Sequence, residues 1–228
     1  MDGRNGYRIE RREFRGNSAM PNPLRRKVKY LLEPLKLLER PNLAAHVAVI
    51  ASLWTKVEIE LGKLIIFVSG NPKEGAATFN ALKSAGSRGD VIRAIAQLRL
   101  DKDEIKQLED LLKEYRRIAG ERNDIIHNLW GISDDMPEAL FRVNAEEIIS
   151  NLAHVVASFY RGGTPPQAAF REKRPIPVVY KGKDFIETEK RITSLVSKIH
   201  QFHFDMGLRR SVPGMRLAPL RTKELQKP

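Results

Sequence analysis

The residues best suited to chemistry in this sequence lie in one short stretch, ERNDIIHNLW, at positions 121–130. This stretch holds Arg122, Asn123 and His127 near the end of a long amphipathic helical pattern. A neutral imidazole, with an unperturbed pKa of about 6.5, can accept a proton near neutral pH. A guanidinium can stabilise negative charge on a phosphoryl group. The residue types therefore favour an enzyme, provided that the helix positions them at an accessible site.

The helical pattern around these residues runs from about residue 101 to about residue 129. On a wheel of about 100° per residue, Arg122 lies in the middle of the apolar face and His127 at its edge, unless Gly120 kinks the helix. A guanidinium in an apolar stripe is unfavourable unless it is paired or lies at an opening. Two structural alternatives follow. Arg122 is clamped by a buried acid such as Glu58 or Glu60, or its charged end reaches solvent near the helix end.

The remaining pattern predicts an all-α protein, a helical bundle of about five to six helices with a small β-hairpin after the motif helix. Asp101 and Glu104 form an expected capping box, and Gly70 is an expected left-handed helix end. The expected helices cover about 24–39 (interrupted by Pro34), 43–68, 75–84, 89–100, 101–129, 145–160 and 184–206. The segment SAGSRGD is expected to be a turn between the helices at 75–84 and 89–100. Residues 161–180 are expected to form an irregular loop.

This pattern divides the chain into three parts. Residues 1–42 form a basic N-terminal extension with a short helix, of which the first 20 residues are expected to be disordered alone. Residues 43–206 form the helical domain, and residues 207–228 form a basic C-terminal tail.

Arg122-Asn123-Asp124-Ile125-Ile126-His127 resembles the R-x4–6-H motif of the HEPN superfamily (higher eukaryotes and prokaryotes nucleotide-binding), in which the position after the arginine is often asparagine. The order of the flanking segments is also similar: WTKVEIELGKL in a long first helix, then SAGSRGD, then the motif with a short hairpin, and a closing helix DFIETEKRITSLVSKIH. The resemblance covers roughly residues 43–205.

The resemblance implies a metal-independent ribonuclease site, usually composed across a homodimer. His127 would be the general acid and base, Arg122 the phosphate clamp, and Asn123 the residue that orients the scissile phosphate. The wheel separates the directions of Arg122 and His127 by about 140°, which makes one chain an awkward site and favours the homodimer. Asp124 departs from the superfamily's motif. An acid at this position repels phosphate unless Arg116 or Arg117 neutralises it. Many members of the superfamily are also non-catalytic.

The charge distribution favours a polyanionic partner. The net charge is +12, with an excess of +6 in residues 1–40, +4 in residues 161–191 and +5 in residues 206–228, whereas the rest is slightly acidic. Such basic arms attract RNA through counterion release, although a solubilising tail would have the same composition. The arginines expected to contact nucleic acid are Arg116, Arg117, Arg209 and Arg210.

Several classes of function are excluded or disfavoured. The chain has no cysteine, hence no disulfide, thiol nucleophile or sulfur-ligated zinc. The most apolar stretch has 12 residues (43–54), whereas a membrane span needs roughly 20, and we expect a cytoplasmic protein without cofactor. His200 and His203, with Asp205 nearby, have spacing that could bind a metal, but no partner carboxylate is evident and no metal site is expected. There is no phosphate-binding loop.

Three hypotheses remain. The first is a HEPN-like metal-independent endoribonuclease, a toxin or defence component, with RNA as substrate. The second is a non-catalytic HEPN-like module that binds nucleic acid or a protein partner such as an antitoxin. The third is a helical scaffold in which Arg122 is only a member of a buried ion pair.

Overall fold

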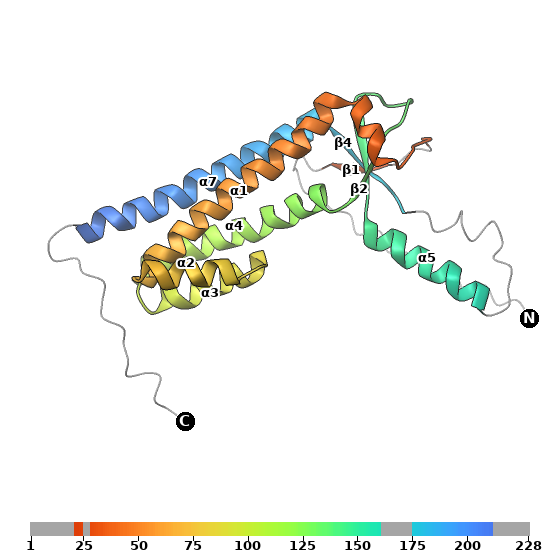
Figure 1. Ribbon diagram of the computed structural model, residues 1–228. Helices are drawn as coiled ribbons and strands as arrows, with labels where there is room; N and C mark the ends of the chain where they lie inside the picture. Colours follow the sequence, from red (N-terminus) through yellow and green to blue (C-terminus); the bar gives the residue numbers. More distant parts are fainter. Residues whose placement is uncertain (1–20, 25–27, 161–174, 212–228) are drawn as a thin grey trace, which may run out of the picture.

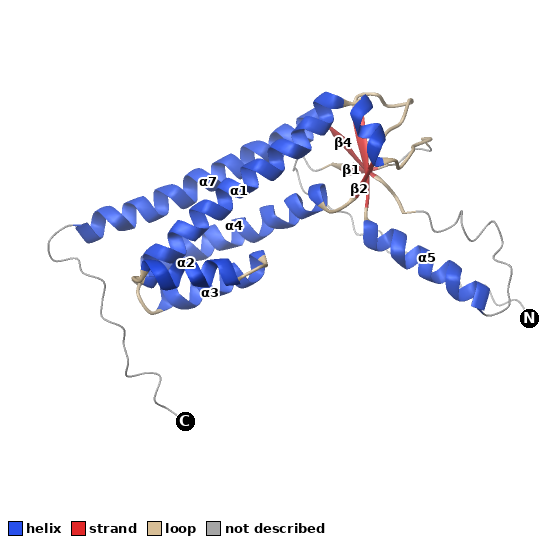
Figure 2. Ribbon diagram, viewed as in Figure 1, coloured by secondary structure: helices blue, strands red, loops and turns tan. Residues whose placement is uncertain are grey.

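Three long helices form the body of the protein. The computed structural model describes residues 21–24, 28–160 and 175–211. Helices α1 (Pro41–Ser69), α4 (Lys102–Ile126) and α7 (Gly182–Ser211) pack against one another, and α2 (Pro72–Ala81) and α3 (Ala85–Gln97) cover α1 and α4 at one end, as Figure 1 shows. The predicted fold class, a helical bundle with a small β element, is confirmed (Figure 2).

Local sequence signals determine where these helices begin and end. Asp101 caps α4 and forms the predicted capping box with Glu104, and Gly70 ends α1 with a φ of 68°, a left-handed conformation that favours glycine. The segment SAGSRGD is not the turn that was predicted. Ser84 accepts a hydrogen bond from the backbone of Ser87 and caps α3, so that residues 85–90 form its first turns.

The core is one continuous apolar cluster between the long helices. Trp54 of α1 stacks on Tyr115 of α4 with ring centroids 5.5 Å apart. Phe185 of α7 contacts the rings of Trp130 and Tyr180, with centroids 5.7 and 5.3 Å away. These contacts join the sheet to the bundle, and all five side chains are buried.

A small antiparallel sheet follows α4. Strands β2 (Leu129–Gly131) and β3 (Ala139–Val143) form the predicted hairpin, and the sheet order is β1-β4-β3-β2. Strand β4 (Val178–Lys181) lies in the segment that was predicted to be an irregular loop, and the short β1 (Asn22–Pro23) pairs with it. Residues 161–174 of that predicted loop lie outside the described residues.

Other boundaries differ from the predictions at both ends of the chain. The helix predicted at 24–39 is reduced to the 3-10 helix η1 (Pro34–Glu39), because Leu31 pairs instead with Ile132 beside the sheet. Helix α7 continues to Ser211, five residues into the predicted tail. Residues 1–20 and 212–228 lie outside the described residues.

Helix α5 (Ala145–Tyr160) has the predicted bounds and projects from the sheet away from the bundle (Figure 1). No helix in the described ranges is long and apolar enough to cross a membrane.

Candidate active site at the end of α4

The motif helix ends earlier than its apolar pattern predicts. Helix α4 stops at Ile126, and His127 adopts a φ of −105° and a ψ of 6°. Side chains that follow the helix bind its last carbonyl groups. The indole N–H of Trp130 in β2 donates to the carbonyl of Ile125 at 2.8 Å, and the side-chain amide of Asn128 donates to the carbonyl of Asp124 at 2.8 Å. These bonds replace helical partners and direct the chain into β2.

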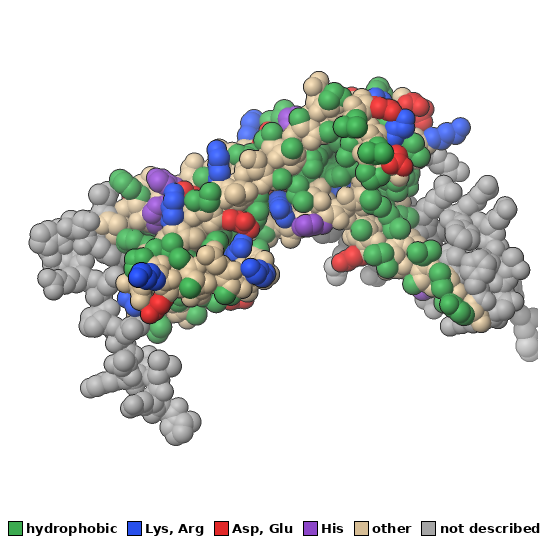
Figure 3. Space-filling view, viewed as in Figure 1, with side chains coloured by type: hydrophobic (Ala, Val, Ile, Leu, Met, Phe, Trp, Pro, Cys, Tyr) green, Lys and Arg blue, Asp and Glu red, His purple; other side chains and the backbone are tan. Residues whose placement is uncertain are grey.

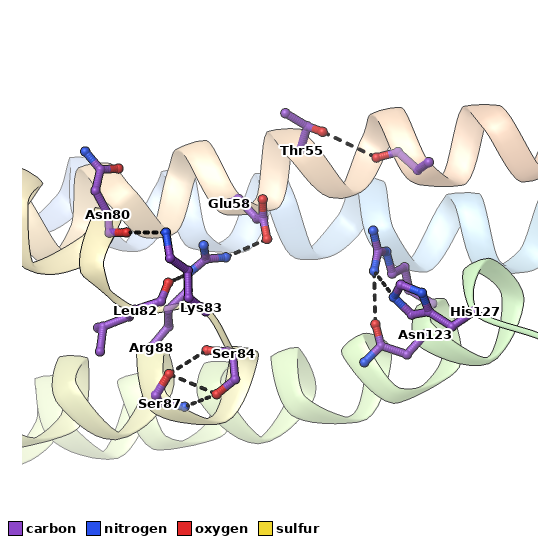
Figure 4. A network of polar contacts seen from close by, with 12 residues as sticks. Thr55, Glu58, Asn80, Leu82, Lys83, Ser84, Ser87, Arg88, Asn123 and His127 are labelled. Atoms are coloured by element: carbon purple, nitrogen blue, oxygen red, sulfur yellow. Dashed lines mark hydrogen bonds and ion pairs between the residues drawn. The ribbon is translucent and has the colours of Figure 1, made fainter. Parts of the chain in front are cut away.

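Arg122 and His127 come together within one chain. Nη1 of Arg122 lies 3.3 Å from Nε2 of His127 and donates to Oδ1 of Asn123 at 3.0 Å. Figure 4 shows Asn123 on the last turn of α4 and His127 directly after it, both joined by dashed lines to the same guanidinium. The wheel directs the two side chains about 140° apart, and this contact shows that they nevertheless meet. The expectation that one chain places the pair awkwardly on a single phosphate stays a prediction.

This contact concerns the nitrogen of His127 that faces Arg122. A guanidinium is only a donor of hydrogen bonds, so the contact is a hydrogen bond in the tautomer whose Nε2 accepts from Nη1 of Arg122. In that tautomer Nε2 is the proton acceptor of the ring.

Arg122 packs on an aromatic ring rather than against an acid. Its guanidinium carbon lies 6.0 Å from the centroid of the Trp54 ring, a cation–π distance. The two acids expected to clamp it have other partners: Glu58 pairs with Arg88 at 2.5 Å and Glu60 with Lys63 at 2.7 Å. Within the described ranges Arg122 has no ion pair, and its buried Nε has no hydrogen-bond partner.

The acid inside the motif is neutralised from the sheet. Arg142 of β3 forms an ion pair with Asp124 at 3.0 Å. The two arginines that were expected to perform this role are engaged elsewhere: Arg116 pairs with Asp90 at 2.5 Å, and Arg117 with Glu121 at 2.7 Å. Sequence reasoning missed Arg142, since only the antiparallel pairing of β2 and β3 places it beside the end of α4.

The four arginines predicted to contact nucleic acid are not gathered at the site. Arg116 and Arg117 are about half-exposed on α4, one to two turns before the motif. Arg209 and Arg210 belong to the last turn of α7, and their side chains lie outside the described part of the chain. Helix α7 runs antiparallel to α4, since Arg191 pairs with Glu121 and Lys198 with Glu114. The end of α7 therefore points away from His127.

The site is open to a large substrate. Asn123, Asp124 and His127 are exposed, and Arg122 is half-buried between them and α1. The arrangement offers a proton acceptor, a cation and an amide along one exposed edge.

Comparison of the chain with protein-family models, with curated proteins and with solved structures finds no significant match.

Proposed function

We propose that the protein is a cytoplasmic, HEPN-like, metal-independent endoribonuclease that acts as a homodimer, in the manner of a toxin or defence component. The observation that carries this proposal is the contact of Arg122 with both Asn123 and His127 on an exposed helix end. Because Arg122 has no acidic partner in the described part of the chain, its charge is available to a phosphate. The ion pair that the scaffold hypothesis requires is not formed among the described residues.

The roles of the residues follow from their positions. Nε2 of His127 accepts the proton of a ribose 2′-hydroxyl, and the 2′-oxygen attacks the adjacent phosphorus. Arg122 stabilises the charge that develops on the phosphoryl oxygens, while Asn123 orients the phosphate. The bond from phosphorus to the 5′-oxygen breaks, and the products carry a 2′,3′-cyclic phosphate and a 5′-hydroxyl.

The departing 5′-oxygen needs a proton, and His127 of the same chain is already occupied as the base. The His127 of a second copy, in its protonated form, supplies an acid at the required place if the two sites face each other across a two-fold axis. This requirement of the chemistry supports the homodimer.

Helix α5 supports the same assembly. Ile149, Leu152, Val156 and Tyr160 are exposed by 40 to 88%, and their spacing of three and four residues places them on one side of the helix. This is the spacing of helices that pair with each other. Figure 3 shows apolar side chains along α5, which packs broadly against none of the other described elements. A second copy of α5 would cover this stripe.

One observation favours the second candidate, a non-catalytic module that binds RNA or a protein partner. Nε2 of His127 already lies 3.3 Å from Nη1 of Arg122, so RNA must displace this contact before His127 acts as a base. In a non-catalytic relative the contact would persist, and Arg122 and Asn123 would only bind phosphate.

A ribonuclease assay in the presence of EDTA tests the proposal. We expect the wild-type chain to produce 2′,3′-cyclic phosphate ends, and Arg122→Ala and His127→Ala to lower the rate by at least about 100-fold. His154→Ala, which alters an exposed histidine of α5, is the matched control for His127→Ala. Intact RNA after prolonged incubation with folded dimer would reject catalysis, and an RNA gel shift lost in Arg122→Ala would then support the non-catalytic module.

A further inference from the structure

Two helices of the bundle place a carboxylate and two imidazoles together. Glu60 belongs to α1, and His200 and His203 belong to α7. Oε2 of Glu60 lies 3.3 Å from Nδ1 of His200 and 3.7 Å from Nδ1 of His203. One ligand atom of each residue lies within 4.8 Å of the others. The cluster uses none of the residues of the proposed ribonuclease site.

The carboxylate is ionised and held in one orientation. Its Oε1 accepts a hydrogen bond from Nζ of Lys63 at 2.7 Å, which leaves Oε2 facing the two histidines. Burial acts to raise the pKa of Glu60, but hydrogen bonds from Lys63 and His200 outweigh it and lower the pKa below its usual value. Glu60 is therefore a charged oxygen ligand near neutral pH, and Lys63 supports it as an outer-shell partner.

The spacing of these atoms suits a small divalent metal ion. Zinc binds imidazole nitrogen and carboxylate oxygen at roughly 2.0–2.2 Å in a tetrahedron, which places neighbouring ligand atoms about 3.4 Å apart. The separations of 3.3 and 3.7 Å from Oε2 are close to this value. Asp205, the acid near these histidines in sequence, does not take part, because it accepts a hydrogen bond from Gln201 at 2.7 Å.

We propose that Glu60, His200 and His203 bind a divalent ion of the zinc class and thereby join α7 to α1. Solvent completes the coordination, since the side chain of His200 is 55% exposed. In the metal-free protein Nδ1 of His203 donates to the carbonyl of Ile199 at 3.1 Å. Metal binding at Nδ1 exchanges this hydrogen bond for a metal bond and moves the ring proton to Nε2.

Titration of the untagged, EDTA-treated and dialysed full-length chain with ZnCl2 tests this site by calorimetry and by melting temperature. We expect saturable binding of one ion per chain and a higher melting temperature, with no such effect of MgCl2. Loss of any ligand, in Glu60→Gln, His200→Ala or His203→Ala, weakens binding by at least about 10-fold. His154→Ala, which removes an exposed histidine from α5, leaves binding unchanged.

Cobalt provides a second readout that does not depend on stability. Co2+ in the wild-type chain gives visible absorption bands of low-symmetry four-coordination, and these bands are lost in His200→Ala. Circular dichroism checks that each variant is folded. Absence of saturable binding in the wild-type chain overturns the proposal, and so does binding that is equal in folded ligand variants. Neither result affects the ribonuclease proposal, which is assayed in EDTA.

Discussion

Arg142 of β3 holds the carboxylate of Asp124 on α4 at a distance of 3.0 Å. The arginine side chain is 12% exposed and also lies over the ring of Tyr180, 5.8 Å from its centroid. The sheet thus supplies the counter-charge for the one acid in the motif, directly beside the residues proposed to bind phosphate.

Removal of that counter-charge should weaken RNA binding. In Arg142→Gln the carboxylate of Asp124 is unpaired next to the phosphate, and we expect the affinity for RNA to fall roughly two- to tenfold through charge repulsion. Asp124→Asn in the same chain should restore it. Filter binding at fixed salt measures both, and a double variant as weak as the single one would contradict this electrostatic role.

Arg122 should contribute little or nothing to the stability of the fold. Its buried Nε lacks a hydrogen-bond partner among the described residues, and an unsatisfied buried donor costs roughly 1–3 kcal/mol. Arg122→Met keeps the apolar contact with Trp54 and removes the unpaired donor. We expect the free energy of unfolding in urea to be unchanged or to rise by up to about 1 kcal/mol. A marked decrease would revive the scaffold hypothesis.

Two glycines near the site should respond in opposite directions to alanine. Gly120 is exposed inside α4, and a Cβ there would meet no atom within 4 Å, so Gly120→Ala should stabilise by about 0.5–1 kcal/mol. A Cβ on Gly131 would lie 2.3 Å from the carbonyl oxygen of Leu31. Gly131→Ala should therefore separate Leu31 from Ile132 and lower the melting temperature. Equal changes in melting temperature for Gly120→Ala and Gly131→Ala would contradict this prediction.

Two buried tyrosines should make the fold sensitive to alkali. Burial raises the pKa of Tyr115 and of Tyr180 from 10.0 to about 12. The folded state therefore retains the phenol protons that the unfolded chain releases. The associated stability is fully present below the unfolded pKa of 10.0 and is lost as the pH rises to about 12, on the order of 2 kcal/mol for each tyrosine.

The measurement is the free energy of unfolding between pH 9 and 12. Tyr115→Phe and Tyr180→Phe should each flatten its decline, whereas Tyr160→Phe, at an 88% exposed position, should not. An unaltered slope in both buried variants would show that other groups cause the alkaline loss.

The stripe on α5 should control the oligomeric state. Leu152→Glu places a charge in the centre of the stripe, and we expect it to convert a dimer into a monomer in light-scattering measurements. Leu38→Glu, at another exposed leucine, is the control and should remain dimeric. A wild-type chain that is monomeric at micromolar concentration would contradict the assembly.

The long helices could be predicted from the sequence because their signals are local. The capping box of Asp101 and the left-handed Gly70 lie within a few residues of the structures that they specify. Strand β4 was missed, since the prolines that precede it favour a loop and only its pairing with β3 makes it a strand. Pairing across the sheet is a property of the whole chain and has no local pattern.

The same distinction applies to the candidate site. Arg122 and His127 were identified from one segment, but the helix end beside them is bound by Trp130 and Asn128 from beyond it. Arg142 reaches Asp124 only through the hairpin, and Glu60 meets His200 only through the packing of α1 on α7. These contacts join residues that are far apart in the sequence, so no local spacing of residues predicts them.

The sheet also sets an order of events during synthesis. Its strands come from both ends of the described chain: Asn22 pairs with Val179, and Leu31 with Ile132. Pairing of such distant segments is slow and must wait until the later segment exists. On the ribosome, the chain therefore cannot complete the support of Asp124 and His127 until β4 and Phe185 have emerged. If the protein is a nuclease, an unfinished chain would be unable to cleave the RNA around it.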